Sequence, residues 1–155
     1  MNANKIFKLL PLSFIMKNCA LCSILKSEEK RIILTTTPSF VCVNKEPLSK
    51  SHIMLLPQRH VCKLDELSAE EAQDLLTTIH TFSAHLQEKF NTQGALTILN
   101  HGKHKTQEHL HFHLLATDGN LRDVMSPYLK APYRKELTLE ELEKLASAIK
   151  DGLLN

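Results

Sequence analysis

Several features that are common in globular proteins are scarce in this sequence. It contains no Trp, two Tyr and only four Gly. So little Gly excludes collagen-like and Gly-rich low-complexity chains. An excess of charge of one sign is also lacking, because 19 basic and 17 acidic residues leave a formal net charge of +2. With near-neutral charge and few aromatic residues, we expect no nucleic-acid partner.

Long apolar runs and a cysteine framework are missing as well. No run of roughly 18 apolar residues occurs, so we expect no helix that spans a membrane. Four Cys are present, and two of them form the segment Cys19-Ala20-Leu21-Cys22. This spacing suits a metal ion better than the disulfide framework of a small secreted protein. The sequence therefore favours a reducing, cytoplasmic compartment.

The length and composition predict one globular domain. With 155 residues, of which 43% are hydrophobic, the chain can bury roughly 70% of its unfolded surface without disulfides. We assign residues 17–155 to the domain and residues 1–16 to an N-terminal extension. Lys5 and Lys8 before a short apolar stretch faintly resemble a signal peptide, but Pro11 interrupts it and no A-x-A-like site follows. A start codon placed too early, with Met16 as the true beginning, is the simpler interpretation.

The hydrophobic pattern predicts an α+β fold. β-rich runs predict two strands within residues 32–43 and further strands at 52–56, 95–100 and 110–116. A capping box of Ser68 and Glu71 precedes a long amphipathic helix, and a second box of Thr138 and Glu141 opens a C-terminal helix. Strands that cluster before and after one main helix are typical of an antiparallel sheet of about five strands with that helix packed on it.

The run from His109 to Leu115 carries three alternating histidines. On a strand, His109, His111 and His113 would lie on one face, about 6.6 Å apart at ~3.3 Å per residue. Core packing has no use for a row of imidazoles with pKa values of about 6.5, so the row indicates a functional site. Two chemistries remain open: a metal ion held by the alternating histidines, or an imidazole nucleophile supported by its neighbours.

Four segments of this chain together resemble the histidine triad family of nucleotide hydrolases and transferases. Residues 109–115 match its H-φ-H-φ-H-φ-φ signature, in which φ is apolar, at every position. Residues 51–60 are similar to the family's G-H-x-L-V-I-P-K-x-H segment, and Asn100-His101-Gly102 to its N-x-G loop. The Cys19–Cys22 segment is similar to the C-x-x-C that opens many bacterial members. The resemblance extends from about residue 18 to residue 116.

The resemblance implies a role for each triad residue. His111 would attack the α-phosphorus of a phosphoramidate, adenylate or dinucleoside polyphosphate, forming a nucleotidyl-histidine that water then resolves. The backbone around His109 would support His111, and His113 would donate to non-bridging phosphate oxygens, so that no catalytic metal is required. The nucleotide would be contacted by five further residues: Asn44, Asn100, Lys105, Thr106 and Gln107.

The resemblance also implies a structural metal and a homodimer. Bacterial members with the C-x-x-C opening bind zinc through the positions that match Cys19, Cys22, His60 and His109. Two thiolates and two imidazoles suit a closed tetrahedral zinc site. We expect His52 to hydrogen-bond only locally, and His80 and His85 to lie at a surface or an interface.

The loop before the triad departs from the family pattern. Residues 102–108 are about two residues shorter than in most members and lack a Gly pair, which leaves leaving-group preference open. Two alternatives to a hydrolase follow. One is a nucleotide-binding module with little turnover. The other is a metallohydrolase in which His109, His111 and His113 hold a catalytic metal, although only Glu108 and Asp118 are nearby carboxylates.

Overall fold

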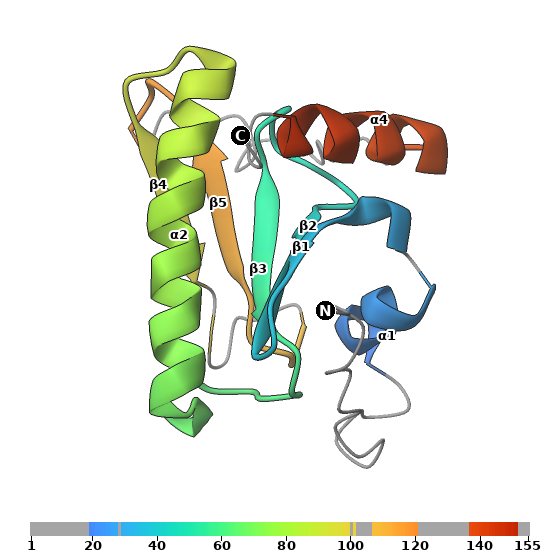
Figure 1. The fold of residues 1–155 in the computed structure, drawn as a ribbon, viewed down its shortest axis with the longest axis vertical. Helices are drawn as coiled ribbons and strands as arrows, with labels where there is room; N and C mark the ends of the chain where they lie inside the picture. The colour runs from blue at the N-terminus through green and yellow to red at the C-terminus, as the bar shows by residue number, and fades with distance from the viewer. Residues whose placement is uncertain (1–18, 28, 100, 102–106, 121–136, 152–155) are drawn as a thin grey trace, which may run out of the picture.

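The computed structural model describes residues 19–27, 29–99, 101, 107–120 and 137–151, and Figure 1 shows its fold. The N-terminal extension and three expected nucleotide contacts, Asn100, Lys105 and Thr106, lie outside the described residues. The elements follow in the order α1 (Ala20–Ser27), η2 (Glu29–Arg31), β1 (Ile32–Thr35), β2 (Ser39–Val43), β3 (Ile53–Pro57), η3 (Leu64–Glu66), α2 (Ala69–Phe90), β4 (Ala95–Leu99), β5 (Phe112–Ala116) and α4 (Leu139–Lys150).

The five strands form one antiparallel sheet in the order β1-β2-β3-β5-β4. The predicted α+β class is confirmed. The first three strands are a meander of consecutive neighbours, whereas β5 inserts between β3 and β4. Ile53 pairs with Leu114 on one side, and Thr97 pairs with Leu114 on the other. The strand that contains His113, the last residue of the triad, is therefore held by hydrogen bonds along both edges.

Helix α2 lies along one face of the sheet, drawn in front of β4 and β5 in Figure 1. Its capping box is confirmed: the Glu71 N–H donates to Ser68 Oγ at 3.1 Å, and the Ser68 N–H donates to Glu71 Oε2 at 2.8 Å. Its apolar stripe packs on the sheet through the buried residues Leu75, Phe82 and Leu86. The helix ends at Asn91, whose φ of 53° is left-handed, a conformation that Asn tolerates better than most residues.

Gly94 precedes β4 at a point where two segments of the chain lie very close together. A Cβ at this position would lie 3.0 Å from the carbonyl oxygen of Thr117. The Thr117 N–H donates to the Gly94 carbonyl at 2.9 Å. Gly94 therefore permits a close approach of the chain at the start of β4 to the chain that leaves β5.

Helix α4 closes the same core at the other end of the sheet, where it packs against η2 and β1 (Figure 1). The predicted capping box is present between Thr138 and Glu141. Leu142 and Ile149 are buried, whereas Leu139 is 63% exposed, so the buried stripe of this helix does not include Leu139. His85 of α2 donates from Nε2 to the Ile149 carbonyl at 2.7 Å, which joins the two helices.

The opposite face of the sheet is covered by α1, a helix that the sequence patterns did not reveal. Its cluster of buried residues is smaller than the one under α2 and α4: Leu21, Ile24, Phe40, Cys42, Met54 and Leu56. Because β2 and β3 are covered on both faces, every residue in these two strands is buried. None of the described helices is long and apolar enough to cross a membrane.

Candidate active site and metal centre

The histidine triad lies at the start of β5 rather than wholly on it. Strand pairing begins at Phe112, so His109 and His111 precede the strand, and the strand predicted over 110–116 began two residues too early. His113 pairs with Met54, a residue of the cluster under α1, which places the site on the α1 face. His109 and His111 are 0% and 4% exposed. Such burial requires that their ring nitrogens find partners.

The partners of His111 define its tautomer. Its Nδ1 lies 2.8 Å from the backbone carbonyl oxygen of His109. A carbonyl oxygen only accepts, so Nδ1 carries the proton and donates. In the neutral ring, Nε2 then keeps its lone pair. The His111 ring meets the His113 ring edge to face, with centroids 4.8 Å apart. His111 thus has the form that an imidazole nucleophile needs, beside a second imidazole.

A fourth histidine defines the tautomer of His113. The Leu48 N–H donates to His52 Nδ1 at 2.9 Å, so neutral His52 carries its proton on Nε2. That Nε2 lies 2.9 Å from His113 Nδ1, to which it donates. The proton of neutral His113 is therefore on Nε2, at the far side of the ring. The expectation that His52 bonds only locally was wrong, and its place directly before β3, which pairs with β5, is the signal that could have found it.

A second cluster brings together Cys19, Cys22, His60 and His109. One ligand atom from each of the four lies within 4.8 Å of the others. Cys22 Sγ is 3.3 Å from Nδ1 of both His60 and His109, and Cys19 Sγ is 3.7 Å from His109 Nδ1. The cysteines come from the start of α1 and the histidines from the segments after β3 and before β5. The predicted ligand set is therefore assembled from three distant parts of the chain and can hold a metal ion.

His109 belongs to both clusters. Its Nε2–H donates to the Pro57 carbonyl at 3.0 Å, which leaves the Nδ1 lone pair toward the cysteines. The pKa of His109 is lowered from 6.5 to about 4, chiefly by burial and to a smaller extent by the charges of His60 and His111, while hydrogen bonds to backbone groups partly offset these effects. The ring is thus neutral at pH 7, which is the state that binds a metal ion. Its backbone carbonyl meanwhile orients His111.

Two of the expected nucleotide contacts, Asn44 and Gln107, belong to the described part of the chain. Asn44 follows β2 and is 8% exposed. Its Oδ1 accepts from the Glu46 N–H at 2.9 Å, and its own N–H donates to the His52 carbonyl at 3.5 Å. These contacts fix Asn44 at the sheet end where His52 lies. Gln107 is exposed.

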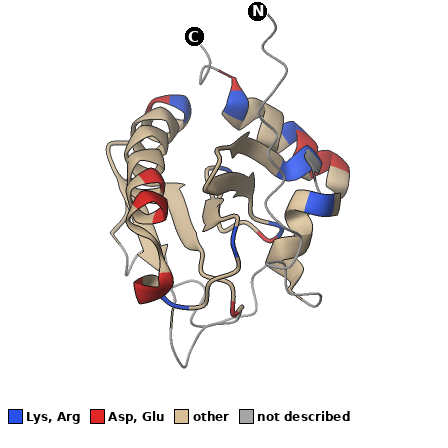
Figure 2. Ribbon diagram, turned by 60° about the horizontal axis from the view of Figure 1, so that its bottom comes forward, with Lys and Arg blue, Asp and Glu red and all other residues tan. Residues whose placement is uncertain are grey.

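The five strands carry no Lys, Arg, Asp or Glu, and Figure 2 shows them in tan between helices that carry blue and red residues. Of the two nearby carboxylates, Glu108 is exposed, and Asp118 accepts from the Gln93 N–H at 2.6 Å. The chemistry of this sheet therefore rests on imidazoles and thiols.

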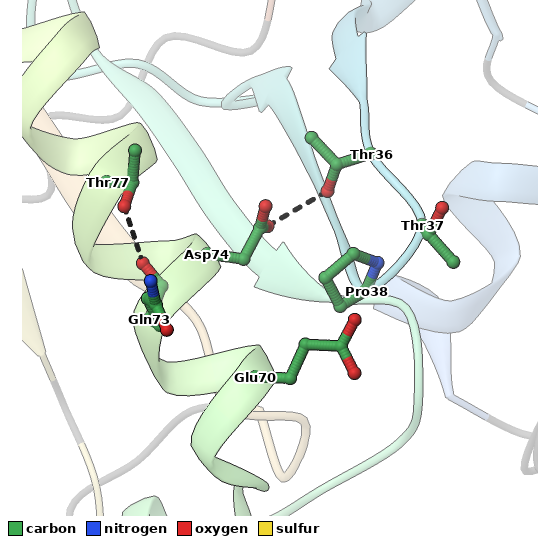
Figure 3. Close-up of a pocket in the computed structure, with 7 residues that line it drawn as sticks. All are labelled: Thr36, Thr37, Pro38, Glu70, Gln73, Asp74 and Thr77. Atoms are coloured by element: carbon green, nitrogen blue, oxygen red, sulfur yellow. Dashed lines mark hydrogen bonds between the residues drawn. The ribbon is translucent and has the colours of Figure 1, made fainter.

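A cavity of about 490 Å³ opens on the other side of the sheet (Figure 3). It lies between the β1–β2 turn and α2, and its lining includes Asp74 and three Thr. Asp74 accepts from the hydroxyls of Thr36, at 2.9 Å, and Ser39. This cavity contains none of the triad residues, and its hydroxyl–carboxylate contacts fasten the turn to α2.

Comparisons with known proteins agree with this geometry. Residues 26–120 match the HIT domain family. The chain is 29% identical over 127 residues to a bis(5'-adenosyl)-triphosphatase of Dictyostelium discoideum, which spans 79% of this chain and 85% of that protein. It is 28% identical over 102 residues to an adenosine 5'-monophosphoramidase of Schizosaccharomyces pombe, which spans 63% of this chain and 73% of the relative.

A solved structure shares the fold. It is a Zn-bound histidine triad family protein from Mycobacterium smegmatis, with a TM-score of 0.64 at 19% identity, covering 85% of this chain and 93% of that one. The family match and the shared fold thus agree with the arrangement of the three histidines. The chain belongs to the HIT domain family.

Proposed function

We propose that the protein is a nucleotide hydrolase or nucleotidyl transferase that works through His111. The observation that carries the proposal is the pair of opposed tautomers: His111 presents a lone pair at Nε2, and His113 presents an N–H at Nε2 beside it. A nucleophile and a proton donor are thus held side by side, His111 by the backbone carbonyl of His109 and His113 by the ring of His52.

The chemistry follows from these two atoms. Nε2 of His111 attacks the α-phosphorus, a P–N or P–O bond breaks, and the leaving group departs with the bonding electron pair and takes up a proton. The Nε2–H of His113 donates to a non-bridging oxygen as charge is redistributed. Water, or another acceptor, then attacks the nucleotidyl-histidine and frees His111. His52 is a positioning residue, because it acts on the substrate only through His113.

The substrate is a nucleoside phosphoramidate, an adenylate or a dinucleoside polyphosphate. The names of two relatives support the first and last of these classes, since one is a triphosphatase of bis(5'-adenosyl) substrates and the other a monophosphoramidase. Asn44 contacts the ribose, a role supported by its fixed position next to His52. Further contacts to the nucleotide come from residues that precede the triad in the sequence: Asn100, Lys105, Thr106 and Gln107.

A structural zinc ion is bound by four residues: Cys19, Cys22, His60 and His109. Their donor atoms fit this ion: two thiolates and two imidazole Nδ1 atoms lie close enough for one tetrahedral centre. When bound, zinc would supply cross-linking and no open coordination position. Its effect is to fasten α1 to the ends of β3 and β5, next to the carbonyl that orients His111.

The protein acts as a cytoplasmic homodimer. β4 is an edge strand that pairs only with β5 among the described residues, and four of its five side chains are half-buried. Such an edge strand can pair with the same strand of a second copy of this chain. None of the cysteines that the structure describes forms a disulfide, and this agrees with a reducing compartment.

The deciding experiment measures AMP release from adenosine phosphoramidate and from diadenosine triphosphate. His111→Ala should abolish turnover of both substrates, by a factor on the order of 10⁴ or more. His80→Ala is the matched control, because His80 is exposed on α2 and should leave the rate unchanged.

Two other results would support competing functions. Nucleotide binding without turnover by the unaltered protein would indicate a binding module. Turnover that survives in His111→Ala but disappears with a chelator would indicate a metallohydrolase, which the carboxylate-free strands disfavour.

A further inference from the structure

A third cysteine lies beside the metal centre but outside its ligand set. Cys62 is half-buried and follows His60 by two residues. Its Sγ is 3.5 Å from Nε2 of the His60 ring, whereas Nδ1 of the same ring is 3.3 Å from Cys22 Sγ. The imidazole of His60 is thus held between two sulfur atoms, one on each nitrogen.

In a neutral imidazole such as that of His60, one ring nitrogen carries the proton and the other carries the lone pair. A neutral ring that offers its Nδ1 lone pair to a metal ion keeps its proton on Nε2. That N–H needs an acceptor, and the Cys62 sulfur is at hydrogen-bond distance from it. A partner of this kind fixes the ring orientation and makes the metal-binding nitrogen more basic.

The chain around Cys62 is fastened independently of any metal. The Cys62 N–H donates to Glu66 Oε2 at 2.7 Å. Arg59 donates to the Glu66 carbonyl at 2.7 Å and to both carboxylate oxygens of Glu71, at 3.0 and 2.7 Å. These bonds tie residues 59–66 to the N-terminus of α2. The Cys62 sulfur is therefore presented to His60 by a backbone that is already in place.

We propose that Cys62 is a positioning residue of the metal centre. Its sulfur accepts the hydrogen bond from His60 Nε2–H, and this bond holds Nδ1 toward the ion. The inference rests on the proposed zinc site. Cys62 itself does not ligate the metal, since its sulfur faces the nitrogen opposite to the one that faces Cys22.

The test is the zinc affinity of the full-length protein, measured by competition with a chromophoric chelator. Cys62→Ala should bind zinc about 10- to 100-fold more weakly, as expected when the hydrogen-bond partner of a metal-binding histidine is lost. Cys62→Ser keeps an acceptor and should recover part of this loss. Cys42→Ala is the matched control, because it removes the one other cysteine outside the proposed ligand set, and its zinc affinity should be unchanged.

A second readout separates positioning from ligation. Cobalt(II) bound by two thiolates absorbs through sulfur-to-metal charge transfer, and we expect the same intensity in Cys62→Ala as in the unaltered protein. A lower intensity would make Cys62 a ligand and overturn the proposed role. If Cys62→Ala does not fold, Cys62→Val, which keeps side-chain bulk but has no acceptor, should show the same loss of affinity.

The outcomes distinguish this inference from the zinc proposal. Unaltered protein that binds zinc, with Cys62→Ala or Cys62→Val binding it equally tightly, would overturn the role of Cys62 alone. Unaltered protein that fails to bind zinc would overturn the metal site and this inference with it.

Discussion

The two faces of the sheet are built on different principles. The face under α2 and α4 is an apolar core, closed by helices of 22 and 12 residues that both begin with a capping box. The face under α1 has a smaller cluster and a helix of eight residues. A helix that short is marginal by itself. On the α1 face, polar contacts of cysteine and histidine therefore supply part of the stabilisation that apolar burial supplies on the α2 face.

The two faces also differ in what their histidines do. On the α1 face, the ring nitrogens of His52, His109 and His111 are each bonded to a backbone group, so each buried imidazole has a defined tautomer. The α2 face has His85, whose bond to the Ile149 carbonyl joins two helices. Substitutions of the apolar residues under α2 should change the free energy of unfolding. Substitutions of the histidines, or of Cys19 and Cys22, on the α1 face should change turnover or metal binding.

Removal of the metal ion should have the largest effect of the changes considered, because it would weaken the α1 face alone. If zinc is present at roughly 1,000 times its Kd, chelation should lower the free energy of unfolding by about 4 kcal/mol. Thermal unfolding of the full-length protein with and without a chelator measures the change. Cys19→Ala should unfold at the same temperature with and without the chelator. An unaltered transition in the unmodified protein would mean that the cluster under α1 suffices to hold that face.

Acid should lower the free energy of unfolding of the metal-free protein, because His109 is buried as a neutral ring. Its pKa is about 4 in the folded state, chiefly because it is buried, against 6.5 ordinarily. The unfolded chain therefore binds the proton more readily, and stability that is complete above pH 6.5 is lost as the pH falls toward 4. The loss amounts to about 3 kcal/mol.

Denaturant unfolding of metal-free protein between pH 7.5 and 4 measures this loss. His109→Gln should remove most of the pH dependence in that window. The other lowered group, Glu71, owes its low pKa first to the hydrogen bond from Arg59, and its ordinary value is 4.5. Its contribution is therefore lost mainly below the His109 window. A slope that persists in His109→Gln would assign the effect to other groups.

His52→Ala should lower kcat by on the order of 10²-fold, the lower end of what a positioned proton donor contributes. The reason is that His113 loses the partner that keeps its proton on Nε2. Steady-state AMP release measures the effect, and KM should change little. His85→Ala is the matched control on the opposite face. It should reduce stability and leave kcat of the folded protein unchanged, and equal losses of kcat in both variants would erase the division between the faces.

Ser68→Ala should have the smallest effect. It removes the side-chain acceptor for the Glu71 N–H at the start of α2, at a cost of about 1 kcal/mol. Denaturant unfolding measures this cost, and Thr138→Ala on α4 should give a similar value. Turnover by the folded protein should not change in either variant. A large loss of turnover in Ser68→Ala would show that α2 also positions the triad.

Local signals predicted most of the fold. Both capping boxes and the long helix are present as expected, and the strands lie within two residues of their predicted positions. The first strand pair and β3 are neighbours, as their adjacency in the sequence suggests. Helix α1 was missed because its eight residues are too few for a clear apolar period. The start of β5 was misplaced because His109 and His111 alternate like strand residues but bond to Pro57 and to their own backbone.

The sequence by itself determined which residues are candidates for the chemistry, because a run of alternating histidines and a C-x-x-C are local patterns. Only the tertiary structure decided what each ring nitrogen does. Tautomers depend on hydrogen-bond partners that are distant in the chain, such as Pro57 for His109 and His52 for His113. Those partners meet because β5 inserts between β3 and β4, an order that no local pattern specifies.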